Sequence, residues 1–128
     1  DVLTRNWDAV GSALDNIVMS PSGPLTRIDQ GGALQYRALG ALKPQEGALH
    51  IPEWESFPTR NRAYKTVFDM AGLKSAGEIP DMDAQLSKLA IATPRQGWTA
   101  WLTSLGLPPD FVRTNGAMLD ARTRLLLQ

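Results

Sequence analysis

Cysteine is absent from the sequence, and histidine occurs once, at His50. Without cysteine the chain cannot form a disulfide, a thiolate nucleophile or a cysteine zinc site. A single histidine also excludes a histidine-rich metal site and a relay between two histidines. Because secreted proteins can lack cysteine as well, the compartment stays open, and both the bacterial cytoplasm and secretion into a host cell are compatible with the composition.

An excess of either charge and a long apolar run are missing too. Thirteen Lys and Arg residues balance thirteen Asp and Glu residues, so no overall field attracts a polyanion or an anionic membrane. No window approaches the roughly 18 to 20 apolar residues of a membrane-spanning helix, and the first residues lack the basic-then-apolar order of a secretion signal. We therefore expect a soluble chain that does not enter a membrane.

The 128 residues, 43% of them apolar, are enough for one hydrophobic core. We expect one domain over 1–128, with a hairpin and loop module at 1–58 and a helical part at 59–128. Because the chain begins with Asp1 and not with Met, we expect it to be a piece of a longer polypeptide. Strands at one end and helices at the other predict an α+β fold.

Short apolar runs at 16–19 and 25–28 flank a turn rich in Ser, Pro and Gly, which predicts a β-hairpin. The run at 33–39 alternates apolar and polar residues and predicts a third strand. Residues 2–14, Leu14 included, suit a helix or a helical turn and loop. Glycines and prolines in 40–58 predict a long loop.

Helical periodicity after residue 59 predicts about four helices. The first covers 60–71, the second follows Asp81 as its cap, and the third has Pro94 in its first turn and stops at Gly106. The last begins near Pro109-Asp110, with Gly116 as a weak point.

Asn16 and Asp29 would lie at neighbouring ends of the antiparallel hairpin. An amide oxygen beside a carboxylate makes a site of the kind that Mg²⁺ prefers. Gly31 and Gly32 would allow backbone or a phosphate to approach closely. Each of these residues also has an ordinary interpretation, because Asp and Asn are common in turns and Asp8 could be a helix cap or a surface carboxylate.

Two stretches, Asn6-Trp7-Asp8-Ala9-Val10-Gly11 through Asp15-Asn16-Ile17 and Arg27-Ile28-Asp29-Gln30-Gly31-Gly32 through Ala38, carry a family resemblance. The region of residues 5–45 resembles the catalytic lobe of atypical bacterial kinases related to the HipA-like and phosphoinositide-kinase-like groups. The resemblance implies that Asp8 is the base-like catalytic residue, that Asn16 and Asp29 bind Mg²⁺, and that Gly31 and Gly32 lie near the phosphates of ATP.

The resemblance also implies that the small lobe, with its glycine loop and phosphate-pairing lysine, would precede residue 1. We therefore expect a portion of an ATP- and Mg²⁺-dependent phosphotransferase that is inactive as an isolated piece.

A noncatalytic alternative remains open. The chain could be a protein-interaction domain of a bacterial effector, conjugation or phage protein that docks a partner through Trp98 and Trp101. Packing of both tryptophans in the core is the ordinary interpretation. A basic and aromatic cluster (Arg60, Arg62, Lys65, Trp54, Phe57 and Tyr64) would suit single-stranded nucleic acid, but the acidic residues Glu53, Glu55 and Asp69 dilute its charge and argue against that partner.

Overall fold

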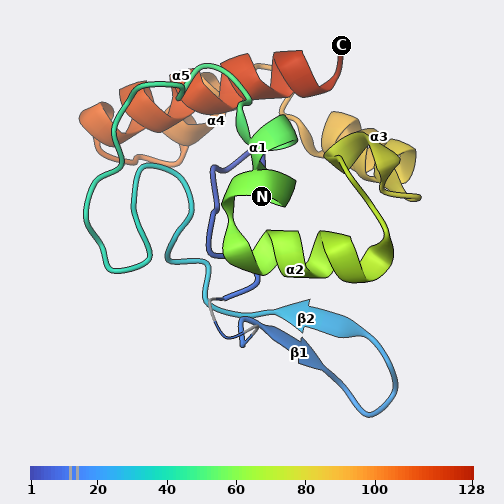
Figure 1. The fold of residues 1–128 in the computed structure, drawn as a ribbon. Helices are drawn as coiled ribbons and strands as arrows, with labels where there is room; N and C mark the ends of the chain where they lie inside the picture. Colours follow the sequence, from blue (N-terminus) through green and yellow to red (C-terminus); the bar gives the residue numbers. More distant parts are fainter. Residues whose placement is uncertain (12, 14) are drawn as a thin grey trace.

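A β-hairpin near the N-terminus is confirmed by the computed structural model, which describes residues 1–11, 13 and 15–128. Strands β1 (Ile17–Met19) and β2 (Leu25–Arg27) are antiparallel, with Val18 opposite Thr26. The hairpin projects away from the helices (Figure 1), and most of its residues are exposed. The described part of 1–14 forms turns, while Leu14 lies outside the described residues.

Five α-helices follow the hairpin in the described chain, where the sequence predicts about four. They are α1 (Glu53–Arg60), α2 (Arg62–Ala71), α3 (Met82–Ala92), α4 (Trp98–Ser104) and α5 (Pro109–Leu126), with a short 3₁₀ helix, η1, at Ala76–Glu78. The fold is therefore α+β, as the sequence predicts. None of the described helices is both long and apolar enough to cross a membrane.

Three local predictions are wrong. Residues 33–39 form turns with a single β-bridge between Tyr36 and Leu42, because Leu34 has a left-handed backbone (φ 55°) that a strand cannot contain. The predicted loop at 40–58 ends at Pro52, whose φ of −61° suits a helix start, so α1 crosses the expected boundary at residue 58. The third helix begins at Trp98, since Pro94 lies in a separate turn closed by Gly97.

Local caps explain the boundaries of the predicted helix over 60–71. The Asn61 side chain accepts hydrogen bonds from the backbone of Ala63 and Tyr64, so α2 begins at Arg62. At the other end Gly72 has a φ of 70° and terminates the helix. Helix α3 begins directly after Asp81 as predicted, although the Asp81 side chain makes no capping hydrogen bond.

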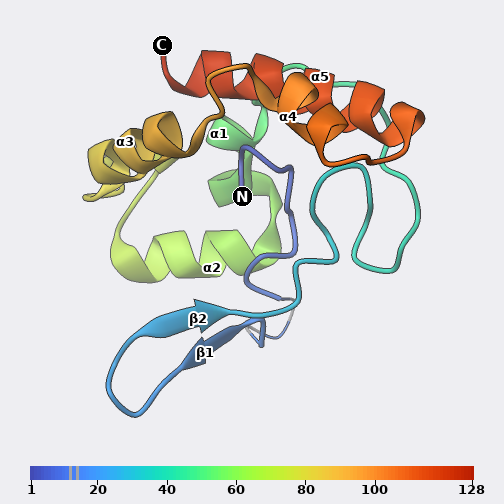
Figure 2. The ribbon, with the colours of Figure 1, turned by 180° about the vertical axis from the view of Figure 1, so that it is seen from behind.

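Two apolar clusters hold the fold together. One joins Ala9 and Val10 to three aromatic rings of helices α1 and α2, Phe57, Tyr64 and Phe68. The other joins Ala48 to the helices α4 and α5, through Leu102, Val112, Met118 and Leu119. Both clusters contain residues from either side of residue 58. The N-terminal segment accordingly runs between the helices and the loops of residues 30–50 (Figure 2).

Helices α4 and α5 make the most extensive contact between two elements, and Gly116 allows it. A Cβ atom at Gly116 would lie 2.5 Å from the Thr99 hydroxyl oxygen and 2.9 Å from the Thr99 Cα. Asp120 on α5 also caps α4, since its carboxylate accepts hydrogen bonds from the backbone of Trp98 (2.7 Å) and Thr99 (3.2 Å). The glycine that weakens the helix locally is therefore required by packing.

Candidate functional site

The loop carrying Asp8 is fastened to the start of the hairpin. The Asn16 amide nitrogen donates a hydrogen bond to the backbone carbonyl of Asp8 over 2.6 Å, and Asn16 is buried. The fully buried Asn6 accepts a hydrogen bond from the Asp8 backbone and donates one to the Gln30 side chain. The structure thus brings Asp8 and Asn16 together, although eight residues of chain separate them.

Asp29 lies at the same end of the hairpin. The Ile28 backbone donates a hydrogen bond to the Asn16 carbonyl (2.9 Å), so Asp29 is one position beyond the partner of Asn16. Asp29 has a left-handed backbone (φ 55°), is exposed, and accepts a hydrogen bond from the Gly31 backbone at 3.2 Å. The backbones of the predicted metal ligands, Asn16 and Asp29, are therefore neighbours at this end of the hairpin. Each side chain also makes a local hydrogen bond.

A cation at this end of the hairpin would need the oxygens of both side chains. The hydrogen bond of Asn16 uses its amide nitrogen, so the amide oxygen is the remaining ligand atom. Across the described part of the chain, no group of three or more His, Cys, Asp or Glu residues is arranged to hold a metal. Amide and carboxylate oxygens are donors that Mg²⁺ accepts, so Asn16 and Asp29 are the residues that would bind it at this end of the hairpin.

Gly32 is required by close packing against the Asp8 loop. It is buried, and a Cβ atom there would lie 2.9 Å from the Asn6 amide oxygen and 3.3 Å from the Asp8 Cβ. At Gly31 the corresponding contact is with the Asp29 carboxylate, at 3.2 Å. In this structure the two glycines bring backbone close to Asn6, Asp8 and Asp29.

A cavity of about 420 Å³ opens beside Asp8 and Gly32. Its other lining residues come from the N-terminal loop and from the loops after the hairpin: Arg5, Trp7, Arg37, Ala38, Lys43 and Pro44. One carboxylate therefore shares this cavity with three cations. A hydroxyl-bearing ligand in it would lie close to the Asp8 carboxylate.

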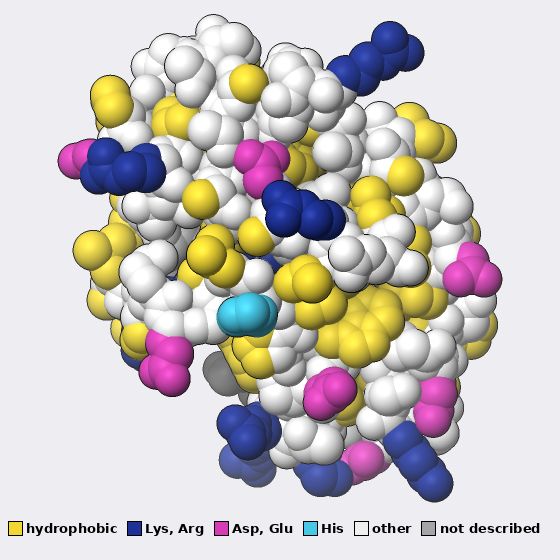
Figure 3. All heavy atoms as spheres, turned by 90° about the horizontal axis from the view of Figure 1, so that it is seen from above, with side chains coloured by type: hydrophobic (Ala, Val, Ile, Leu, Met, Phe, Trp, Pro, Cys, Tyr) yellow, Lys and Arg dark blue, Asp and Glu magenta, His cyan; other side chains and the backbone are white. Residues whose placement is uncertain are grey.

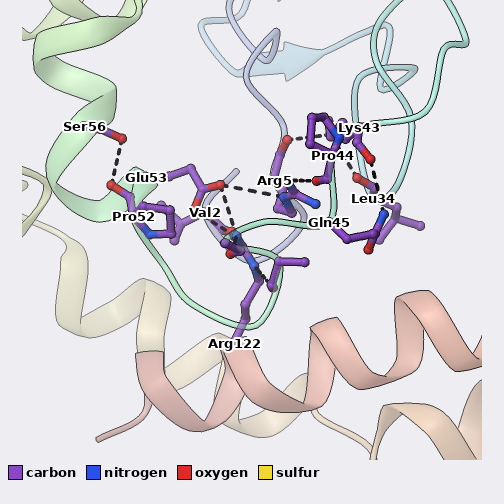
Figure 4. A network of polar contacts seen from close by, with 12 residues as sticks. Val2, Arg5, Leu34, Lys43, Pro44, Gln45, Pro52, Glu53, Ser56 and Arg122 are labelled. Carbon is purple, nitrogen blue, oxygen red and sulfur yellow. Dashed lines mark hydrogen bonds and ion pairs between the residues drawn. The ribbon is translucent and has the colours of Figure 1, made fainter.

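Lys43 and Arg5 hold the wall of this cavity together (Figure 4). The Lys43 ammonium donates hydrogen bonds to the backbone carbonyls of Arg5 (2.6 Å), Gly32 (2.5 Å) and Leu34 (3.0 Å). The Arg5 guanidinium donates one to the Pro44 carbonyl at 2.9 Å. Burial, and then the neighbouring charge of Arg5, lower the pKa of Lys43 from 10.5 to about 8.

Sequence reasoning missed Arg5, Arg37 and Lys43 as residues of the site. Arg37 falls on the polar face of the strand predicted at 33–39, which does not form, and Lys43 follows the predicted metal ligands in the chain. The sequence does contain a signal, because the stretch between Asp29 and Glu46 has two cations, Arg37 and Lys43, and no acidic residue. Such an unbalanced stretch indicates a local positive field even when the net charge is zero.

A second cavity, of about 440 Å³, lies between the N-terminal segment and helices α1, α2 and α3. Its lining is largely apolar and includes Trp54, Phe57, Val67, Leu86 and Leu89. It contains none of the predicted site residues. Its titratable side chains, Asp1, Arg27 and Tyr64, are already hydrogen-bonded to one another. We therefore assign the candidate site to the first cavity, where the predicted residue Asp8 lies beside three cations.

The aromatic residues proposed to contact a partner separate into buried and exposed ones. Phe57 and Tyr64 stack on each other in the core with ring centroids 4.5 Å apart, so these rings are not available to nucleic-acid bases. Trp98 donates its indole N–H to Thr123 and packs against the second cluster, while Trp101 is 38% exposed.

Seen from above (Figure 3), charges of both signs are interspersed around apolar side chains.

Comparisons with protein-family models, with curated proteins and with solved structures find no match to this chain.

Proposed function

We propose that this chain is a catalytic-lobe portion of an ATP- and Mg²⁺-dependent phosphotransferase that needs a small lobe for turnover. The observation that carries the proposal is the hydrogen bond of 2.6 Å from the Asn16 amide to the Asp8 carbonyl. It joins the proposed base to a proposed metal ligand at the hairpin end where Asp29 also lies. The cavity beside Asp8 supplies room for an acceptor.

Phosphoryl transfer depends mainly on positioning and on charge stabilisation, so few protein groups have to react. Bound Mg²⁺ would neutralise charge on the phosphates of ATP. In the proposed step, the Asp8 carboxylate takes the proton from an acceptor hydroxyl, and that oxygen forms a bond to the terminal phosphorus as the bond to ADP breaks. Asn16 holds the Asp8 loop in place, and Asn16 and Asp29 would hold the metal.

Titration with Mg²⁺ and then Mg²⁺-ATP, followed by amide NMR spectra of the whole chain, tests this proposal. We expect saturable shifts at Asn16, Asp29 and Gly31, and at least a tenfold loss of Mg²⁺ affinity in Asp29→Asn, because a carboxylate ligand becomes neutral. Asp69→Asn, exposed on α2, is the matched control. Shifts that stay the same in Asp29→Asn would refute the metal site.

The isolated chain should not turn over ATP. This expectation separates the proposal from that of a complete enzyme. ATP hydrolysis by this chain that Asp29→Asn abolishes would show that no small lobe is needed.

A protein-interaction function is the second candidate, and the exposed part of Trp101 favours it. Trp101 meets Trp98 edge-on with centroids 5.8 Å apart, and Leu105 beside it is 55% exposed. Because Trp98 is tied to Thr123, Trp101→Ala is the informative variant. Loss of partner capture with an unchanged melting temperature would support this function, and unchanged capture would exclude Trp101 as its anchor.

A further inference from the structure

Positive charge exceeds negative charge around the first cavity. The four cations Arg5, Arg37, Lys43 and Arg122 face only two carboxylates, Asp8 and Glu53, so 4 − 2 leaves a surplus of two positive charges. Arg122 takes up the Glu53 carboxylate through two hydrogen bonds of 2.9 and 3.1 Å. Arg5 approaches the same carboxylate only to 3.9 Å, so its charge is poorly compensated.

Arg5 also has donors without acceptors. It is 7% exposed, and one nitrogen, Nη2, donates to the Pro44 carbonyl. Within the described residues, its buried Nε and Nη1 have no hydrogen-bond partner. Buried donors are satisfied in the great majority of cases, and leaving them unsatisfied is costly. Figure 4 shows this guanidinium between the Glu53 carboxylate and the Pro44 carbonyl, and Arg5 lines the cavity.

We propose that this cavity binds a phosphate group, with Arg5 and Arg37 as its hydrogen-bond donors. A phosphate carries close to two negative charges at neutral pH, which matches the surplus, and guanidinium groups bind it through paired N–H donors. The Lys43 ammonium adds charge from the wall, since its three N–H groups already bind carbonyls. This proposal uses the cavity assigned above to the acceptor and adds the chemical class of its ligand, while its donors, Arg5 and Arg37, are independent of Asn16 and Asp29.

The ionisation of Lys43 is consistent with a positive cavity. Its pKa is lowered by burial and by the charges of Arg5, Arg122 and Arg37, while Glu53 raises it. Burial, the largest of these causes, disfavours charge of either sign, but the contributions of Arg5, Arg122 and Arg37 reflect a positive field, and that field favours an anion. The volume of about 420 Å³ also leaves room for the rest of a phosphate ester.

Inorganic phosphate is the first probe, added to the whole chain with a chelator present so that no metal contributes. Sodium chloride at equal ionic strength is the reference, because nonspecific attraction is screened equally in both. We expect saturable shifts of the Gly32, Ala38 and Lys43 amides with phosphate alone. Equal responses to phosphate and chloride would overturn the proposal.

The exposed Arg37 provides the variant that preserves the fold. Arg37→Ala should weaken phosphate binding about tenfold, as expected for a charged hydrogen bond, whereas the control Arg113→Ala, on the outer face of α5, should not change it. Arg5→Gln should abolish binding if its circular dichroism spectrum remains native. Should Arg5→Gln unfold, Arg37→Ala decides, and unchanged affinity there would overturn the proposal.

Two further probes identify the source of the phosphate. Metal-free ATP that competes with inorganic phosphate, when phosphoserine does not, would assign the site to a nucleotide phosphate. Competition by phosphoserine would assign it to a phosphorylated acceptor or to free phosphate. If no phosphate compound binds, the proposal fails, while the Mg²⁺-dependent shifts at Asn16 and Asp29 would still report on the metal site separately.

Discussion

Replacement of Arg122 by Met should destabilise the protein more than any surface substitution. Arg122 is fully buried on α5 and donates hydrogen bonds to both Glu53 oxygens and to the backbone carbonyls of Val2, Gly47 and Ala48. Its loss leaves the Glu53 carboxylate, 2% exposed, without its main partner. Breaking a buried pair in this way costs about 3–5 kcal/mol, a large part of the roughly 5–15 kcal/mol of a typical domain.

Urea unfolding followed by tryptophan fluorescence measures this cost. With a slope of about 2 kcal/mol per M, the midpoint should fall by about 1.5–2.5 M in Arg122→Met. A second change, Glu53→Gln in the same chain, should recover part of the loss because it removes the unpaired charge. Arg113→Met, which breaks only an exposed pair with Asp110, is the control and should change the free energy of unfolding by less than about 0.5 kcal/mol. A midpoint for Arg122→Met equal to that of the control would refute the reasoning.

Three other predictions follow from the packing and ionisation of single residues. The pKa of Lys43 is lowered from 10.5 to about 8 in the folded protein, so the unfolded chain binds more protons between pH 8 and 10.5. The free energy of unfolding, measured from urea midpoints, should therefore rise with pH across that window. A Lys43→Met variant that keeps the same rise would contradict the assignment to Lys43. Gly116→Ala should lower the melting temperature, since clashes with Thr99 of about 1–3 kcal/mol exceed the gain in helix propensity of about 1 kcal/mol, and an increase would disprove the close approach. Gly32→Ala should shift the Asp8 amide resonance by displacing Asn6, whereas an unshifted resonance would show that this segment can move aside.

Elements whose signals are local were predicted correctly. The turn residues between 19 and 25 predict the hairpin, and helical periodicity with Asp81 or Pro109 at the start predicts α3 and α5. The third strand failed because alternation alone cannot reveal the positive φ of Leu34. Helix α4 was placed too early, since its real cap is the Asp120 carboxylate, which lies 22 residues from Trp98.

The candidate site likewise combines residues that local sequence patterns identify with residues that they do not. Asp8, Asn16 and Asp29 could be named from motif spacing, and the structure brings Asp8 and Asn16 into contact and places Asp29 at the same hairpin end. The positive cavity wall could not be predicted, because Arg5 and Lys43 are 38 residues apart and meet only after the loops have folded.

By itself, the amino-acid sequence determined the α+β class, the hairpin and most helix positions, because these depend on turn chemistry and on periodicity over a few residues. Only the tertiary structure decided which charges became buried together, as in the pairing of Arg122 with Glu53 across 69 residues. The physical reason is that burial and the electrostatic field depend on distances in space, which local sequence patterns do not encode.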